Sequence, residues 1–470
     1  IEARRANRAA LLAPDCKMTL SDRAKPTSTL VGARRFPKTL SISLLPFRGN
    51  EMSHHDDRCQ RPRSIDGIRR RDLLLNGSSA LAAASIASVV PTSIRSAMAQ
   101  LPSRRPHIVY IVADDLGWKD VGFHGSDIKT PNIDRLAQDG ARLEQFYVQP
   151  MCTPTRAALM TGRYPCRYGL QTLVIPTPSK YGLPTDERLL PQALKEAGYR
   201  TVMVGKWHLG HADRKYWPRQ RGFDYHYGSM VGEVDYFTHS SANVRDWYRN
   251  DRPVKEQGYV TQLWGADAVA QINAHDPKTP LFLYLAFTAP HSPYQAPKEY
   301  IEKYRHIEDP TRRAYAAMIT CMDDEIGKVV SALAKKNMRE NTLIVFSSDN
   351  AAGEIPAMAG GSNGPFRGSF FTPPAEGSMR APAMVRWPGK VPSGVVTEEA
   401  LTAHDWYRPF AALAGASDRV PSDRPLDGVD ASEFVLGSSK TSGRQEALAG
   451  ARSSRTRHTA SARSSWPAWA

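Results

Sequence analysis

The chain has 470 residues, of which 41% are hydrophobic and 23% charged, an ordinary balance for a globular protein of two or three domains. The net charge of +15 lies at the ends: residues 1–99 hold 17 Lys and Arg against 8 Asp and Glu, and residues 437–470 hold 6 against 1. Because the residues between hold 39 against 38, the composition argues against nucleic-acid binding. No long apolar run predicts stable membrane insertion, and five cysteines are too few for a disulfide scaffold.

The first 99 residues have the composition of a leader. Residues 1–51 lack hydrophobic periodicity, so they are either a disordered leader or sequence upstream of a start at Met52. Arginines at 69–71, leucines at 73–75, an Ala- and Ser-rich stretch and the small residues around 97–99 then follow the order of an export signal. Paired arginines before leucines are typical of the twin-arginine route. We therefore expect a signal over about residues 69–99 and an exported protein, periplasmic or extracellular.

Four continuously apolar runs predict strands that are buried on both faces, as in a parallel sheet. They cover residues 107–113, 201–204, 281–287 and 342–346. Helices are predicted between them over residues 131–139, 189–197 and 311–336, with Thr130-Pro131 at one start and Gly140 and Gly198 after two of the ends. The alternation predicts an α/β fold with a large mixed, mainly parallel sheet sandwiched by helices.

Polar residues follow each of these strands directly. The carboxyl ends of parallel strands meet at one edge of a sheet, where α/β folds bind ligands. In strand order the residues are Asp114 and Asp115, Lys206 and His208, His291, and Asp349 and Asn350. A helix cap would explain any one of these groups, but four together predict an active site at this edge.

The segment from Cys152 to Arg156 predicts the start of a helix. Pro154 suits a first turn, and Gly162 is expected just past the helix end. Cys152 would then lie where free N–H groups and the helix dipole favour negative charge, with Arg156 one turn further on the same face. A lone buried cysteine is the alternative, and it is the expected role of Cys166 and Cys321, which have no such context.

Cys152-x-Pro-x-Arg156, continuing to Arg163 as Ala-Ala-Leu-Met-Thr-Gly-Arg, resembles the signature of type I sulfatases, the arylsulfatases of the alkaline-phosphatase superfamily. The resemblance covers roughly residues 105–436. Its other motifs match in order: Ala113-Asp114-Asp115-Leu-Gly117, Gly205-Lys206-Trp207-His208-Leu209-Gly210, Ala289-Pro290-His291, Ser348-Asp349-Asn350, Arg380-Ala-Pro382 and Arg386-Trp387-Pro388-Gly389. It implies an alkaline-phosphatase-like fold and a hydrolase of sulfuric esters, acting on a sulfated small molecule or glycan.

The resemblance also implies the nucleophile and a metal site. In that family a formylglycine-generating enzyme oxidises the motif cysteine, here Cys152, to formylglycine, whose hydrate supplies the attacking oxygen. The implied metal ligands are Asp114, Asp115, Cys152, Asp349 and Asn350. Asp114, Asp115, Asp349 and Asn350 offer hard oxygen donors, which select Ca²⁺ or Mg²⁺ over Zn²⁺, and the family prefers calcium.

The remaining roles follow from the same resemblance. Lys206 and Arg156 would stabilise the anionic sulfate oxygens or the hydrate. His291 would protonate the leaving alcohol, and His208 would be the base when sulfate is released. Family members usually carry Arg-Gly-x-Lys after the Asp-Asn motif, whereas Arg367-Gly-Ser-Phe370 places a phenyl ring at the lysine position. One charge-assisted contact to sulfate, worth about 1.5–3 kcal/mol, would then be absent.

Two other functions remain open at this point. One is a phosphatase or phosphonate monoester hydrolase of the same superfamily, and the other is an inactive truncated homologue that acts only as a binding protein. Residues 100–397 are predicted to form the catalytic domain. Residues 398–436 would start a truncated C-terminal subdomain, with a helix over 404–414, and residues 437–470 read as a disordered tail or a frame slip. Core packing is the expected role for most aromatic residues in the stretch from Trp217 to Trp247.

Overall fold

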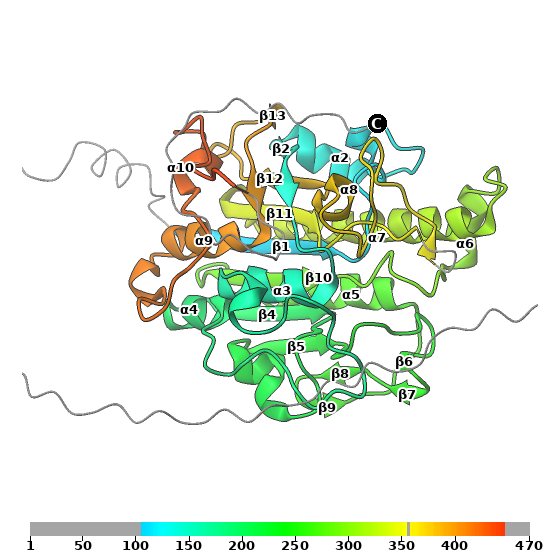
Figure 1. Cartoon of the computed structure of the whole chain (residues 1–470), viewed down its shortest axis with the longest axis horizontal. Helices are drawn as coiled ribbons and strands as arrows, with labels where there is room; N and C mark the ends of the chain where they lie inside the picture. Colours follow the sequence, from blue (N-terminus) through cyan, green and yellow to red (C-terminus); the bar gives the residue numbers. More distant parts are fainter. Residues whose placement is uncertain (1–104, 355–357, 447–470) are drawn as a thin grey trace, which may run out of the picture. The chain divides into compact units, whose positions relative to one another are not determined.

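The computed structural model describes residues 105–354 and 358–446 (Figure 1). The predicted leader, the export signal and the last 24 residues of the predicted tail lie outside these ranges. None of the helices in the described ranges has the length and apolar character needed to cross a membrane.

A ten-stranded sheet carries the fold, with the strand order β13-β2-β12-β11-β1-β10-β4-β5-β8-β9. Its centre is parallel: β11 (Thr342–Ser348), β1 (His107–Ala113), β10 (Leu281–Ala286), β4 (Arg200–Gly205) and β5 (Tyr225–Gly228). Every residue of β1, β10 and β11 is buried, which explains their uninterrupted apolar sequences. The four predicted strands are confirmed to within two residues at either end.

Short strands extend the sheet on both sides and have no counterpart in the sequence prediction. Beyond β11 lie β12 (Ala383–Arg386), β2 (Ala141–Leu143) and β13 (Val395–Thr397), with β12 antiparallel to both neighbours. Beyond β5 lie the antiparallel β8 (Tyr248–Arg249) and β9 (Arg252–Pro253). Separate two-stranded pairs join β3 (Phe146–Tyr147) to β14 (Leu401–Thr402), and β6 (Ser240–Ser241) to β7 (Val244–Arg245). The sheet is therefore mixed, as predicted.

Helices cover both faces of the sheet (Figure 1). On one face α3 (Cys152–Thr161), α4 (Leu190–Glu196) and α9 (Tyr407–Leu413) pack against alternate β1 residues such as Tyr110. On the other face α2 (Pro131–Gln138), α5 (Val260–Asn273) and α7 (Pro310–Lys335) pack against Ile111 and its neighbours. The remaining α6 (Lys298–Lys303), α8 (Glu376–Met379) and α10 (Ser432–Val435) are short. Helices α2, α4 and α7 match their predicted ranges, and the sandwich is confirmed.

The segment after residue 397 shares the core of the main sheet. The predicted helix over 404–414 is present as a 3-10 helix (Ala403–Trp406) followed by α9. Phe410 of α9 packs edge-on against Tyr110 of β1, with ring centroids 6.0 Å apart. Residues 437–446, which composition assigns to the tail, are described as well. Within them the Arg444 Nε donates to the Asp405 carboxylate at 2.6 Å.

Two smaller expectations have different outcomes. Tyr236 and Trp247 are buried in the core, as expected for the aromatic stretch. Cys321 is buried on α7, but Cys166 is exposed, so the expectation of burial is wrong there. Cys166 lies in a short 3-10 turn (Pro165–Arg167) outside the packed layers.

Candidate active site

The loops after β1, β4, β10 and β11 and the beginning of α3 bring the predicted residues together. Helix α3 begins at Cys152 and ends at Thr161, and the following Gly162 has a φ of +69°, the left-handed conformation that glycine adopts readily. The side chain of His291 is 12% exposed. The others are at most 4% exposed: Asp114, Asp115, Cys152, Arg156, Lys206, His208, Asp349 and Asn350.

Asp114 connects the cysteine to both cations. Its Oδ1 accepts a hydrogen bond from Cys152 Sγ at 3.2 Å. Its Oδ2 accepts one from Lys206 Nζ and lies 3.7 Å from Arg156 Nη2. Burial opposes ionisation of Asp114, but the charges of Lys206, His291 and Arg156 outweigh it and hold the pKa of this carboxyl below its usual range. The group is therefore an ionised carboxylate.

Arg156 reaches from α3 across to the end of β11. Its Nε donates to Asp349 Oδ2 at 2.8 Å, and its Nη1 donates to the Lys206 carbonyl at 2.9 Å. Burial, and then the charge of Asp114, raise the pKa of Asp349 to about 7 although Arg156 opposes them. Burial likewise raises the pKa of Asp115. The carboxylates are thus more crowded than the two side-chain cations can balance, which favours a further positive charge at this position.

A group of side chains at this position could hold a metal ion. One ligand atom each from Asp114, Asp115, Cys152 and His291 lie within 4.8 Å of one another. Asn350 donates its amide to Asp115, while Asn350 Oδ1 and Asp115 Oδ2 are buried without a hydrogen-bond partner. Buried unpartnered oxygens are costly, and a cation would satisfy them.

Two further residues adjoin or belong to this group, one of them predicted as a metal ligand and the other not. Asp349 lies next to it, since its Oδ1 accepts from the Asp115 N–H at 3.4 Å. His291, which the sequence assigns only to proton transfer, is a member of the group itself.

The two histidines have distinguishable ring nitrogens. His208 Nε2 lies 3.2 Å from the Ile175 carbonyl, so this nitrogen carries the proton and Nδ1 keeps its lone pair, without a partner. Burial, with the charges of Lys206 and Arg156, lowers the pKa of His208 well below its usual value. His291 Nδ1 lies 2.5 Å from the Ser292 carbonyl, which leaves Nε2 3.6 Å from Asp115.

A close backbone approach fixes the end of β4. Gly205 has a φ of +120°, and a Cβ at this position would lie 1.9 Å from the Ala286 carbonyl oxygen of β10. The Lys206 N–H donates to that same oxygen at 2.8 Å. Lys206 therefore follows β4 directly at a point where β4 and β10 lie in close contact.

Two residues that the sequence prediction missed contact the same site. The hydroxyl of Tyr315, on α7, accepts from the Gly117 N–H at 3.1 Å and lies 3.0 Å from the Asp115 carbonyl and 3.1 Å from Asp120 Oδ2. Thr288 donates to Asp114 Oδ2 at 3.5 Å. Thr288 immediately precedes the motif that ends at His291, so its position was a usable signal, whereas nothing in the sequence of α7 marks Tyr315.

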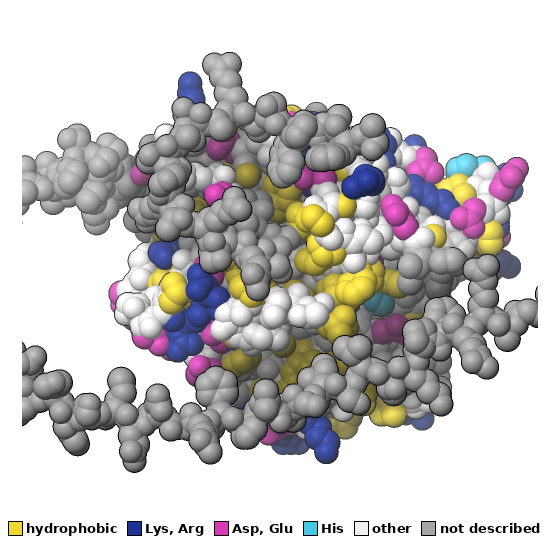
Figure 2. All heavy atoms as spheres, in the orientation of Figure 1, with side chains coloured by type: hydrophobic (Ala, Val, Ile, Leu, Met, Phe, Trp, Pro, Cys, Tyr) yellow, Lys and Arg dark blue, Asp and Glu magenta, His cyan; other side chains and the backbone are white. Residues whose placement is uncertain are grey.

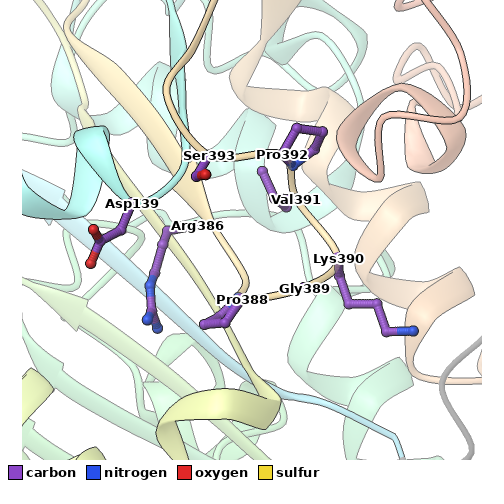
Figure 3. A pocket seen from close by; sticks show the side chains of 8 residues that line it. All are labelled: Asp139, Arg386, Pro388, Gly389, Lys390, Val391, Pro392 and Ser393. Atoms are coloured by element: carbon purple, nitrogen blue, oxygen red, sulfur yellow. The ribbon is translucent and has the colours of Figure 1, made fainter.

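The pocket in Figure 3 lies elsewhere and shares no residue with this site. It has a volume of about 480 Å³ and is lined by Asp139, Arg386 and residues 388–393. The Lys390 side chain points away from Arg386, so the basic groups do not converge there (Figure 3).

Known proteins resemble this chain over the same region. The family profile named Sulfatase matches residues 106–416. Arylsulfatase J of Mus musculus is 44% identical over 339 residues, which is 70% of this chain and 56% of that protein. N-acetylgalactosamine-6-sulfatase of Rattus norvegicus is 37% identical over 348 residues, 69% of this chain and 64% of that protein. The chain thus spans less than two thirds of either relative.

Solved structures resemble it as well. Ps i-CgsB in complex with k-i-k-neocarrahexaose matches with a TM-score of 0.68 and 37% identity, covering 73% of this chain and 78% of that one. The PsFucS1 sulfatase from Pseudoalteromonas sp. matches with a TM-score of 0.67 and 30% identity, covering 76% and 78%. The predicted fold class is confirmed. With the profile match spanning every residue of the buried site, the chain belongs to the sulfatase family.

Proposed function

We propose that this chain hydrolyses sulfate esters at the site around Asp114. The observation that carries the proposal is the hydrogen bond from Cys152, at the start of α3, to a carboxylate that also binds Lys206 and lies beside Arg156. The proposal is supported because Cys152, two cationic side chains and several acidic side chains form one buried cluster. Such a cluster can bind a compact anion and stabilise the charge that develops on it.

Position 152 and a cation would supply the groups that an unmodified chain lacks. Cys152, oxidised to formylglycine by a formylglycine-generating enzyme, provides a hydroxyl nucleophile through its hydrated aldehyde. Asp114, Asp115, Asp349, Asn350 and residue 152 would hold a divalent cation, for which we propose Ca²⁺, and this cation would supply Lewis-acid activation when bound. The unpartnered oxygens of Asp115 and Asn350 support this donor set.

The other residues bind the sulfate group and move protons. Lys206 and Arg156 donate to the non-bridging sulfate oxygens. As the bond between sulfur and the alcohol oxygen breaks, His291 Nε2 gives that oxygen its proton. His208 Nδ1, which keeps a lone pair, accepts the proton that must be removed when sulfate leaves. Water enters overall, so one ester and one water give one alcohol and hydrogen sulfate.

Turnover of two chromogenic esters tests this proposal. The full chain, coexpressed with a formylglycine-generating enzyme, should hydrolyse 4-nitrophenyl sulfate faster than 4-nitrophenyl phosphate, and Cys152→Ala should remove the activity. Faster turnover of the phosphate ester would favour the phosphatase alternative. Binding of sulfate esters without turnover of either compound would favour the inactive binding protein.

The relatives suggest a substrate class, and residues 69–99 suggest a cellular location. Relatives named for sulfated sugars, together with the complex containing neocarrahexaose, support a sulfated glycan or small molecule as the substrate. The signal over residues 69–99 would direct folded protein out of the cytoplasm. Changing Arg70 and Arg71 to lysine should then leave precursor in the cytoplasm, whereas unimpaired export would contradict the twin-arginine route.

A further inference from the structure

Exposed hydrophobic side chains gather around the active site. Among residues 105–354 and 358–446, seven large hydrophobic side chains are exposed. Four of them lie on three loops, over residues 169–183, 232–239 and 365–375, whereas Val244 lies on β7 and Val395 and Val396 lie on the edge strand β13. Figure 2 shows hydrophobic side chains gathered across the middle of one face, between α3 and α8. We use the name apolar rim for Leu173, Phe237 and Phe371, one from each loop.

The first two loops are attached directly to catalytic residues. Ile175 lies two residues after Leu173. Its N–H donates to the Thr153 hydroxyl at 3.1 Å, and its carbonyl accepts from His208. Next to Phe237, the Tyr236 hydroxyl donates to the His291 carbonyl at 2.9 Å. Leu173 and Phe237 are 55% and 48% exposed, so each presents an apolar surface on a loop that contacts a proposed acid or base.

The third loop holds Phe371 beside the nucleophile. The Phe371 N–H donates to the Pro150 carbonyl at 3.1 Å, two residues before Cys152. The preceding N–H, of Phe370, donates to the Ala352 carbonyl at 2.9 Å, two residues after Asn350. Phe371 has a φ of +67° and is 52% exposed. A bulky residue in the left-handed region is strained, and such strain clusters at ligand sites.

The charges of the three loops bear on the class of substrate that they favour. Together these loops contain two basic residues, Lys180 and Arg367, against two acidic residues, Glu233 and Asp235. A chain with many sulfate groups needs several cations outside the catalytic centre to offset its charge. Three half-exposed apolar side chains on loops without net charge instead suit an uncharged, apolar surface.

We infer that the apolar rim selects sulfate esters whose alcohol is uncharged and apolar next to the ester oxygen, and disfavours polysulfated chains. This inference deepens the proposed function and rests on it. Phe371 is the specificity-determining residue with the most direct link to position 152. Its ring would cover the leaving group while the buried cations hold the sulfate.

Binding to a variant without turnover tests the rim separately from catalysis. In the full chain carrying Cys152→Ser, 4-nitrophenyl sulfate should bind more tightly than inorganic sulfate and than a sulfated neocarrahexaose, as measured by isothermal titration calorimetry. Adding Phe371→Ala should weaken the aryl ester about fivefold, because half of the ring loses its contact, and leave inorganic sulfate unchanged. The matched control is Val396→Ala, since Val396 is 51% exposed on β13 and should alter neither affinity.

Three outcomes would overturn the inference: equal weakening of ester and inorganic sulfate by Phe371→Ala, tighter binding of the hexaose, or no binding of the aryl ester. A different result would contradict the proposed function. If the formylglycine-containing chain hydrolyses no sulfate ester at all, that function is wrong whatever Phe371→Ala does to binding.

Discussion

The Tyr315 hydroxyl holds the turn that carries two proposed metal ligands. Asp115 has a φ of +61°, a conformation that a non-glycine residue keeps only when its surroundings enforce it. Tyr315 lies on α7 and is fully buried, and its hydroxyl contacts the backbone on both sides of Leu116. Replacing Tyr315 with phenylalanine removes the hydroxyl, and with it these hydrogen bonds, and leaves the ring in place.

The expected loss follows from the hydrogen bonds. In Tyr315→Phe the Gly117 N–H loses the hydroxyl that accepts from it, and a buried donor without a partner costs about 1–3 kcal/mol. The hydroxyl proton, shared between the Asp115 carbonyl and Asp120, contributes about another 1 kcal/mol. The free energy of unfolding should therefore fall by about 2–4 kcal/mol.

Urea unfolding of matched variants measures this. Tyr407 is equally buried, but its hydroxyl has no partner in the described part of the chain, so Tyr407→Phe should change stability by less than about 0.5 kcal/mol. Calorimetric titration should also show weaker Ca²⁺ binding in Tyr315→Phe, by about tenfold if roughly 1.4 kcal/mol of the loss falls on the turn. Equal stability losses in the two variants, or an unchanged calcium affinity, would refute the positioning role.

Four further predictions concern single positions. Mass spectrometry of the tryptic peptide should show Cys152 about 18 Da lighter, the loss expected for formylglycine, and an active enzyme with only the free thiol would contradict this. Asp349→Ala should remove bound calcium and activity together, as elemental analysis and ester turnover will show, and activation by zinc instead would exclude the hard-cation site. Phe370→Lys should raise turnover of 4-nitrophenyl sulfate if a sulfate contact is missing, while a fall would mean that the ring already fits its own substrate. Burial lowers the pKa of His226 from 6.5 to about 4, so as the pH falls the unfolded chain binds the proton first and stability is lost between pH 6.5 and 4. His226→Gln should flatten the stability profile in that range, and an unchanged slope would exclude His226 as its source.

The sequence predicted the buried half of the fold better than its edges. The strands β1, β10 and β11 are covered on both faces, so their apolar residues run without a break and mark their own limits. β8 and β9 have two residues each, and β13 is largely exposed, so neither a periodicity nor an apolar run identifies them. These strands form only because the neighbouring strand offers free backbone groups.

The residues of the site likewise divide into those that the sequence could place and those that it could not. Side chains at strand ends, such as Lys206 and Asp349, could be placed together from topology alone. The tautomer of His208 depends on its contact with the Ile175 backbone carbonyl. Every residue type carries such a carbonyl, so the sequence could not predict this contact. Tyr315 is 200 residues away from Asp115, and only the packing of α7 against the sheet brings the two into contact.

Gly205 shows that tolerance to substitution in this site depends on space as well as on chemistry. It has no side chain and takes part in no proton transfer, yet alanine there would collide with the Ala286 carbonyl and open the contact between two central strands. The residue that would move with it is Lys206, whose N–H is bound to that carbonyl. Variation at position 205 should therefore be as restricted as at position 152, and a survey of tolerated substitutions that scored only reactive side chains would overlook it.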